Sequence, residues 1–287
     1  MLEVTDVTRT YGQGPGAHVA IEGVRLSVSE GELVSIVGPS GCGKSTLLRC
    51  IAGLLPPTQG TIMLSGSRVE GVPDRLSVVF QDYSRSLYPW LTVRDNVALP
   101  LRRTERSRKA RRAVADESLA AIGLPGVGQK YPWQLSGGMQ QRVAIARALA
   151  GDPALLLMDE PFGSVDAQTR EDLEDLTLRV RRERGITILL VTHDIDESVY
   201  VGDRVIVLTP GPGRVLADLK VDLPAPRDQI STKELPEFVQ LRTEVSRLIR
   251  GHSNKNDGSA PGSAPDSAPG SAPEAATATS QQSSPLS

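Results

Sequence analysis

The sequence is poor in cysteine and in long apolar runs, and each shortage excludes a class of protein. Only two cysteines occur in 287 residues, Cys42 and Cys50, so a disulfide framework is excluded and a reducing cytosol is expected. The longest apolar runs, such as ITILLV from Ile186 to Val191, have the length of a strand and are too short to cross a bilayer. The stretch MLEVTDVTRTYG at the start lacks the apolar core of a signal peptide. If the protein serves a membrane, we expect another chain to span it.

The sequence also lacks a large net charge. Its formal net charge is −2, so nothing favours bulk binding of nucleic acid, and we expect no nucleic-acid partner. A basic stretch, LRRTERSRKARR, runs from Leu101 to Arg112. It could meet anionic lipid, but a solvated helix face is the interpretation that we favour.

Composition divides the chain into three parts. A folded domain is expected at 1–225, a helical extension at 226–251 and a tail at 252–287. The tail contains four Ser-Ala-Pro repeats between residues 258 and 274 and no large apolar cluster. Such a segment cannot offset the entropy of ordering, so we expect a disordered tether.

The folded part alternates strand-like and helix-like segments. Short strands separated by turns fill residues 1–80, and buried strand patterns return in ALLLMDE and ITILLVTHD. Between them, from about 82 to 150, the pattern is helical, with Met139, Val143, Ala146 and Ala150 on one face. This order predicts an α/β fold with a mainly parallel sheet, an N-terminal antiparallel β part and an inserted helical subdomain.

A phosphate-binding loop is predicted where the apolar run ELVSIV meets a helical pattern. The segment GPSGCGKST satisfies the motif G-x-x-x-x-G-K-[ST] in the strand-loop-helix context that the motif requires. The predicted nucleotide-binding residues are Gly38, Pro39, Ser40, Gly41, Cys42, Gly43, Lys44, Ser45 and Thr46. Backbone N–H groups of the glycines would surround the phosphates of ATP, Lys44 would reach the outer phosphates, and Ser45 would bind Mg²⁺. The core is therefore expected to be of the P-loop (RecA-like) type.

Polar residues end several of the predicted strands. Asp159 closes LLLMD and is a candidate Mg²⁺ ligand, and Glu160, which follows it, would face an attacking water. Gln81 closes LSVVFQ, and His193 follows ITILLVT. Since ligands of parallel sheets bind at the carboxyl ends of the strands, we expect these side chains to meet there.

A second anion-binding feature lies far along the chain from the first. In LSGGMQQR, Ser136, Gly137 and Gly138 open a predicted helix. Free N–H groups and the positive end of the helix dipole suit an anion at such a position. One nucleotide does not obviously need two such sites.

These motifs together resemble the ATPase subunit of ATP-binding cassette (ABC) transporters, over roughly residues 1–220. The resemblance implies an ATP hydrolase that works as a head-to-tail dimer of two copies. In that family each ATP lies between the phosphate loop of one chain and the LSGG signature of the other. Ser136, Gly137 and Gly138 would then bind the partner's ATP, which would explain the two anion sites.

The resemblance also assigns roles by matching position. It implies that Gln81 senses Mg²⁺ and water and is itself a metal contact, beside Ser45 and Asp159. Glu160 would be the general base, and His193 would steady the γ-phosphate. Asp166, in GSVDA, would link the two sites of the dimer, and Tyr11 would stack on adenine, unless it is only a tyrosine in a turn.

A narrower resemblance is to importers of the nitrate, sulfonate and taurine type. It is carried by YPWLTVRDNVALPL, MDEPFGSVDAQTR and VDLPAPRD. It implies a two-copy permease that docks near Trp90 and Leu91, an extracytoplasmic solute-binding protein that works through the permease, and a peripheral place on the cytoplasmic face of the membrane. The ATPase does not touch the solute, so its sequence barely encodes which solute is carried.

Two other interpretations stay open at this point. One is a soluble cassette ATPase of DNA repair or translation, although such proteins usually carry coiled-coil insertions or two cassettes. The other is a degenerate regulatory module, which would be expected to lack Glu160 or His193. For Cys42 we expect a reactive thiolate, favoured by the helix dipole and by Lys44; the alternative is a cysteine that only fills its loop position.

Overall fold

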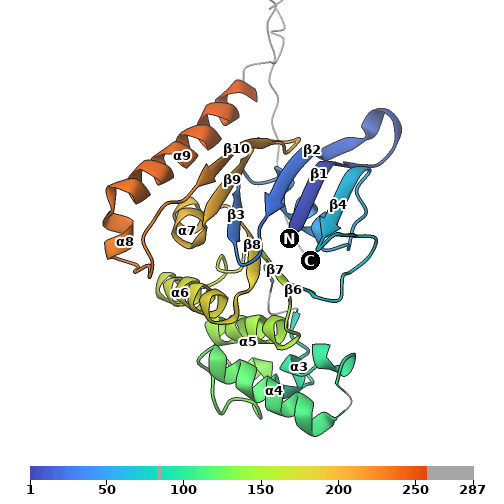
Figure 1. The fold of residues 1–287 in the computed structure, drawn as a ribbon, viewed down its shortest axis with the longest axis vertical. Coiled ribbons are helices and arrows are strands. Elements are labelled where there is room, and N and C mark those ends of the chain that lie inside the picture. The colour runs from blue at the N-terminus through green and yellow to red at the C-terminus, as the bar shows by residue number, and fades with distance from the viewer. Residues whose placement is uncertain (83–85, 106, 257–287) are drawn as a thin grey trace, which may run out of the picture.

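The fold contains two sheets. It is seen in a computed structural model that describes residues 1–82, 86–105 and 107–256, with side chains to residue 251. Figure 1 shows the smaller sheet beside the larger one, and a cluster of helices at the far end of the larger sheet. The smaller sheet is antiparallel, in the order β2-β1-β4-β5. Its strands are β1 (Leu2–Tyr11), β2 (His18–Val28), β4 (Gln59–Leu64) and β5 (Ser67–Arg68).

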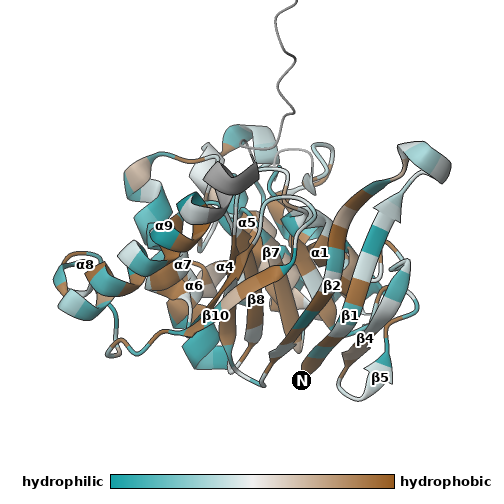
Figure 2. Cartoon of the chain, turned by 90° about the horizontal axis from the view of Figure 1, so that it is seen from above, coloured by the Kyte–Doolittle hydropathy of each residue, from teal (hydrophilic) through white to brown (hydrophobic). Residues whose placement is uncertain are grey.

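The larger sheet is parallel except at one edge. Its order is β10-β9-β3-β8-β7-β6, and only β10 runs antiparallel to its neighbour. The strands are β3 (Leu33–Val37), β6 (Leu76–Val79), β7 (Leu155–Asp159), β8 (Thr187–Thr192), β9 (Arg204–Leu208) and β10 (Val215–Lys220). Every residue of β3, β7 and β8 is buried, as in a sheet that is covered on both faces. The apolar strands therefore form the brown centre of Figure 2.

Helices cover the parallel sheet and form its connections. Helix α1 (Lys44–Ile51) follows the phosphate loop, α6 (Ala167–Arg184) follows β7, and α7 (Ile195–Val201) follows β8. Two apolar clusters pack on the sheet, one of them continuous with the antiparallel sheet and the other with the inserted helices. The expected combination of parallel sheet, antiparallel β part and helical insertion is thus observed.

The inserted helices pack on one another at the lower end of Figure 1. They are α3 (Val93–Val97), α4 (Arg108–Ala121) and α5 (Gly137–Ala150), with short 3₁₀ turns at Pro100–Arg102 and Pro132–Gln134. Each of the three helices begins after a hydroxyl side chain that accepts a backbone N–H of the first turn: Thr92, Ser107 and Ser136. A further 3₁₀ turn, Gly14–Gly16, joins β1 to β2.

Two helices follow the last strand. Helix α8 (Ser231–Glu234) leads into α9 (Pro236–Asn256), which lies along the outer side of α7 in Figure 1. Phe238 and Val245 of α9 are fully buried in the core. The disordered tail was expected to begin at residue 252, but α9 continues to Asn256; the rest of that expected tail, 257–287, lies outside the described residues. In the part of the chain that is described, no helix combines the length and apolarity that a membrane span needs.

Candidate nucleotide and catalytic site

The phosphate loop joins β3 to α1. At one position of the loop, Gly43, the backbone conformation and the close packing allow only glycine. Gly43 has a φ of +96°, and a Cβ added there would lie 2.5 Å from the carbonyl oxygen of Ala20. Both observations exclude an ordinary side chain. The loop borders a cavity of about 290 Å³. The cavity is lined by Tyr11, His18, Ala20, Ser40, Gly41, Gly43, Lys44, Ser45, Thr46 and Glu160.

Lys44 is the buried cation of this loop. It is only 5% exposed, and its Nζ donates to the carbonyl oxygens of Gly38, at 2.7 Å, and of Pro39, at 3.0 Å. Among the described residues no carboxylate forms an ion pair with it. Because these partners are neutral carbonyls, the ammonium group can attract the phosphates of a nucleotide.

Ser45, in the first turn of α1, lies beside Asp159 at the carboxyl end of β7. The hydroxyl of Ser45 donates to Oδ1 of Asp159 at 3.0 Å. Burial raises the pKa of the Asp159 carboxyl, and the hydrogen bond from Ser45 opposes that rise. A hydroxyl and a carboxylate are the oxygen donors that Mg²⁺ accepts beside phosphate and water. The residues predicted as metal ligands therefore fit Mg²⁺ in their chemistry.

Glu160 is held in an unusual backbone conformation. Its φ is +45°, in the left-handed region that non-glycine residues seldom adopt. Its N–H donates to the carbonyl of Val191 on the neighbouring strand β8, at 2.8 Å. Such a conformation costs about 1–3 kcal/mol and persists only where the surrounding structure enforces it. Here it turns the Glu160 side chain out of the sheet and toward the phosphate cavity.

Gln81 and His193 converge on one oxygen of Glu160. The Gln81 amide Nε2 donates to Glu160 Oε2 at 2.7 Å, and His193 Nδ1 lies 3.2 Å from the same oxygen. The three residues come from the ends of β6, β7 and β8, which are neighbours in the sheet. The structure thus brings together the amide, carboxylate and imidazole that were predicted as catalytic.

The loop that carries His193 is tied to helix α6. Asp194 caps α7, because its Oδ1 accepts the Glu197 N–H at 3.1 Å. Its other oxygen, Oδ2, contacts Arg170 Nη1 at 3.4 Å. The His193 side chain itself is 57% exposed. The ring is therefore open to a ligand while its loop is anchored from two sides.

Helix α6 begins at Asp166, the residue predicted to link two sites. Its carboxylate accepts the Thr169 N–H at 3.0 Å and the Thr169 hydroxyl at 2.7 Å. These hydrogen bonds hold the pKa of Asp166 below its usual range. Asp166 is exposed and stays charged as a helix cap, so the point at which the preceding loop enters α6 is fixed.

The signature residues lie elsewhere in the same chain. Ser136 caps α5 by accepting the Met139 N–H at 3.4 Å. A Cβ on Gly138 would lie 2.4 Å from the Thr169 methyl group, so only glycine lets α5 approach α6 this closely. Ser136, Gly137 and Gly138 are absent from the described residues that line the phosphate cavity. Within one chain, the two predicted anion sites are therefore separate.

Cys42 departs from the sequence-based expectation. We expected a thiolate, but Cys42 is only 1% exposed and burial raises the pKa of its thiol, although Lys44 acts in the opposite direction. The expectation was wrong because the side chain points into the core, where it packs with the apolar cluster beneath the antiparallel sheet. Burial outweighs the nearby cation.

Tyr11 lies at the edge of the phosphate cavity. Its hydroxyl is 3.3 Å from Thr46 Oγ1, and the residue is 37% exposed. The Arg9 guanidinium lies 5.1 Å from the ring centroid. His18 lines the cavity too, although nothing in the sequence around it suggested this. The pairing of β1 with β2 places Tyr11 opposite His18, a long-range contact that local patterns do not encode.

Buried carboxyl groups lie in the middle of α6 and in the first turn of α7. Glu174 of α6 is 2% exposed, and burial raises its pKa to about 7. Burial also raises the pKa of Glu197 on α7 well above its ordinary value. Gln229, from the segment before α8, donates its amide to Glu174 Oε2 at 3.1 Å. The C-terminal segment therefore closes over the junction of α6 and α7.

Aromatic residues gather between the sheet and the inserted helices. A cavity of about 620 Å³ is lined partly by Phe80, Tyr88 and Arg147. Trp90, which is 70% exposed, packs against Tyr88 with ring centroids 5.2 Å apart. Burial lowers the pKa of Arg147, whose guanidinium donates to the carbonyl of Ser86. Exposed aromatic rings beside a groove are typical of a protein-binding surface.

Comparison with known proteins gives consistent relatives. A family model described as "ABC transporter" matches residues 21–163. The chain is 46% identical over 241 residues to the nitrate import ATP-binding protein NrtC of Synechococcus elongatus, covering 83% of this chain and 36% of that protein. It is 43% identical over 249 residues to the taurine import ATP-binding protein TauB of Escherichia coli O157:H7, covering 85% of this chain and 95% of that protein.

A solved structure agrees with the same assignment. It is a dimeric, post-hydrolysis state of the ATP-binding cassette MJ0796 bound to ADP and Pi. The TM-score is 0.69 at 38% identity, covering 77% of this chain and 99% of that chain. The chain therefore spans about a third of the length of NrtC but nearly all of TauB and of the MJ0796 cassette. The expected P-loop fold and the expected family are confirmed: the chain belongs to the ABC transporter family and has the fold of its ATP-binding cassettes.

Proposed function

We propose that the chain hydrolyses ATP as the ATPase subunit of an importer of a small solute. The observation that carries this proposal is the convergence of Gln81 and His193 on Glu160 Oε2, next to the cavity of the phosphate loop. A degenerate regulatory module would not need a carboxylate that is held in a strained conformation beside that cavity. The chemistry therefore favours an active ATPase.

In this proposal each side chain has a distinct role in hydrolysis. Lys44 and the loop N–H groups bind the β- and γ-phosphates. Ser45 and Asp159, with Gln81, would hold Mg²⁺, which supplies charge to stabilise the phosphoryl oxygens when it is bound. Glu160 accepts a proton from the attacking water, a contribution of about 10²–10⁴-fold in rate. His193, exposed beside Glu160, would donate a hydrogen bond to the γ-phosphate.

The second anion site is assigned to a second copy of the chain. Ser136, Gly137 and Gly138 are not among the described residues that line this chain's own phosphate cavity, and Ser136 and Gly137 are exposed at the N-terminus of α5. A head-to-tail dimer would place that N-terminus against the γ-phosphate bound by the partner. The dimeric structure of MJ0796 supports this arrangement. Asp166 would then lie at the junction of the two sites.

The membrane partner is assigned to the aromatic groove. Phe80, Tyr88 and Trp90 expose apolar surface between the sheet and the inserted helices. We propose that a permease dimer docks there and that the chain works at the cytoplasmic face of the membrane. A solute-binding protein would deliver the solute to the other side of the permease. By analogy with NrtC and TauB, the solute is nitrate, taurine, another sulfonate or a similar small compound.

The test has two parts. The purified full chain should hydrolyse ATP in the presence of Mg²⁺, and Glu160→Gln should abolish most of that activity. Capture of the tagged chain from solubilised membranes should bring down a polytopic permease, and Trp90→Ala should weaken that capture without changing ATP affinity. A soluble role in DNA repair or translation would instead predict no membrane partner. Absence of a permease in the captured material would overturn the proposal.

A further inference from the structure

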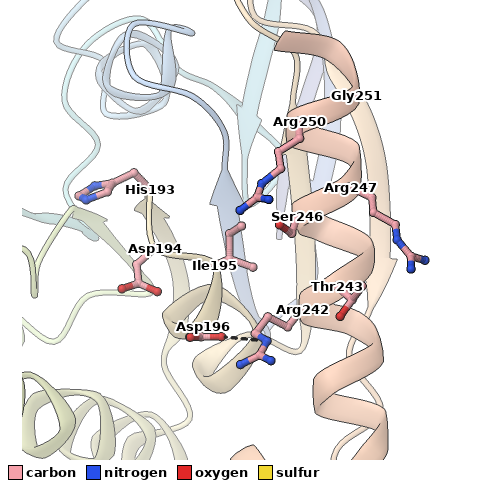
Figure 3. A pocket seen from close by; sticks show the side chains of 10 residues that line it. All are labelled: His193, Asp194, Ile195, Asp196, Arg242, Thr243, Ser246, Arg247, Arg250 and Gly251. Atoms are coloured by element: carbon pink, nitrogen blue, oxygen red, sulfur yellow. Dashed lines mark ion pairs between the residues drawn. The ribbon is translucent and has the colours of Figure 1, made fainter. Parts of the chain in front are cut away.

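A second large cavity lies away from the phosphate loop. It has a volume of about 960 Å³ and opens between the loop after β8 and the middle turns of α9 (Figure 3). His193 and Ile195 lie on one side, and Arg242, Ser246 and Arg250 lie along α9 on the other. None of its residues also lines the phosphate cavity. Its volume is in the range of small-molecule sites, about 300–1,000 Å³.

The carboxylates at the border of this cavity are already engaged. Asp196 pairs with Arg242 at 3.6 Å. Asp194 uses one oxygen to cap α7 and the other to contact Arg170. Neither aspartate is therefore free to neutralise a further cation in the cavity.

Arg250 supplies a positive charge that neither of these aspartates neutralises. Within the described part of the chain it forms no ion pair. Figure 3 shows its guanidinium turned toward the α7 side, with the Ser246 hydroxyl one helical turn below it on the same face. A guanidinium presents paired N–H donors that match the oxygens of a phosphate, sulfate or sulfonate. The hydroxyl can add a third donor.

The opposite wall combines an apolar and a polar group. Ile195 is partly buried and packs on the core, and His193 borders the far side of the cavity with its ring turned away from α9 (Figure 3). We propose that this cavity binds a small molecule with an oxyanion head group, held by Arg250 and Ser246, with its remaining atoms against Ile195. The ligand would lie beside His193. Since His193 contacts Glu160, occupancy of the cavity would disturb the catalytic cluster and slow ATP hydrolysis, a consequence that rests on the proposed function.

Titration calorimetry on the full chain tests the binding step. Saturation with Mg²⁺-ADP is measured first, so that the phosphate loop is filled and a failure of the nucleotide site is seen separately. Sulfate is then titrated at constant ionic strength. We expect one sulfate bound per chain and, for Arg250→Gln, a dissociation constant raised by about ten-fold or more, since a charged hydrogen bond is lost.

Arg247→Gln is the matched control. Arg247 lies on the same helix, but its side chain points away from the α7 side in Figure 3. Arg247 also borders the cavity, but because its guanidinium points away from the α7 side, we expect Arg247→Gln to bind sulfate within about two-fold of the wild type. Absence of sulfate binding to the wild type, or an equal loss in both variants, would overturn the proposal, because general attraction to a basic helix predicts equal losses.

Two further measurements define the ligand and its effect. Phosphate, which hydrolysis releases, and 2-aminoethanesulfonate, a solute-like sulfonate, are titrated separately, and the tighter of the two identifies the source of the oxyanion. The better ligand should reduce ATP hydrolysis by the wild type and leave that of Arg250→Gln unchanged. Inhibition that persists in Arg250→Gln would contradict an effect through this cavity.

Discussion

His193 Nδ1 lies 3.2 Å from Glu160 Oε2, the same oxygen that accepts the Gln81 amide. The oxygen proposed to take a proton from water is thus held by two groups from neighbouring strands. Each group can also turn toward a bound nucleotide, since Gln81 and His193 are both exposed. In the proposed mechanism, this contact would couple the state of the γ-phosphate to the orientation of the Glu160 carboxylate.

The first prediction concerns that base. Glu160→Gln should bind ATP with nearly unchanged affinity and hydrolyse it about 10²–10⁴-fold more slowly, because the amide cannot accept the proton. Steady-state phosphate release and equilibrium nucleotide binding measure the two effects. Glu117→Gln, an exposed change on α4, is the control. If Glu160→Gln hydrolyses ATP at a rate within a few-fold of the wild type, Glu160 is not the general base.

The second prediction separates the two anion sites. Lys44→Ala should weaken ATP binding to the monomer by about ten-fold or more, because a buried cation is removed. Ser136→Arg should leave monomeric binding intact yet prevent both hydrolysis and formation of the ATP-bound dimer. Nucleotide titration of each monomer, followed by sizing in the Glu160→Gln background, gives the answer.

Ser136→Arg also removes the N-cap of a helix, so a control variant that loses an equivalent N-cap elsewhere is needed. Ser107 caps α4 in the same way, by accepting the Ala110 N–H at 3.2 Å. Ser107→Arg should lose comparable stability and still dimerise. If Ser136→Arg weakens monomeric ATP binding as much as Lys44→Ala does, the two sites serve one nucleotide and the dimer proposal fails.

The third prediction follows from the burial of both cysteines. Cys42 and Cys50 should react slowly with a thiol reagent in the native chain at neutral pH, because burial raises both pKa values, that of Cys50 to about 11. Reaction should accelerate on unfolding in urea. The rate of labelling, followed at pH 7 and pH 9 with and without denaturant, provides the measurement. Rapid stoichiometric labelling of native Cys42 at pH 7 would restore the thiolate hypothesis.

The fourth prediction assigns a positioning role to Arg170. Arg170→Ala should lower kcat about ten-fold and leave ATP affinity unchanged, since a charged contact that orients the His193 loop is lost. Arg170→Lys should recover part of kcat. Arg182→Ala, an exposed change on the same helix, serves as the control. A parallel fall in kcat and nucleotide affinity would instead indicate a general loss of structure.

The fifth prediction concerns pH. A carboxyl whose pKa is higher in the folded state holds its proton there after the unfolded chain has lost it, so stability falls as pH rises. For Glu174 this loss of stability falls in the pH range between the ordinary pKa of a glutamate and its raised pKa of about 7. The slope contributed is about 1.4 kcal/mol per pH unit. Urea unfolding at pH 5 and pH 8 should show a smaller difference for Glu174→Gln than for the wild type; equal differences would contradict it.

The strands and the phosphate loop were predictable because their signals are local. ELVSIV followed by GPSGCGKST encodes a buried strand, a glycine turn and a helix within one stretch of sequence. Gln81, Asp159 and His193 were expected to meet because parallel strands end at one edge of a sheet. The packing of the cysteine in that loop was not predictable, since it depends on where the antiparallel sheet lies.

The contacts made by the C-terminal segment could not be predicted from the sequence either. Gln229 meets Glu174 across 55 residues, and Arg250 reaches the neighbourhood of His193 only because α9 packs along α7. No residue pattern near Arg250 indicates a cavity. A helix can be recognised from its own apolar face, but the element that it will pack against is decided by the whole fold.

The close approach of Gly138 to Thr169 has a consequence for motion. Thr169 donates two hydrogen bonds to Asp166. The first turn of α5 and the first turn of α6 are therefore in direct contact. A shift of the signature helix must carry the Asp166 loop with it. In the proposed dimer both features face the partner's nucleotide. In each chain, the signature residues and the Asp166 loop would then move toward or away from the partner's nucleotide as one rigid unit.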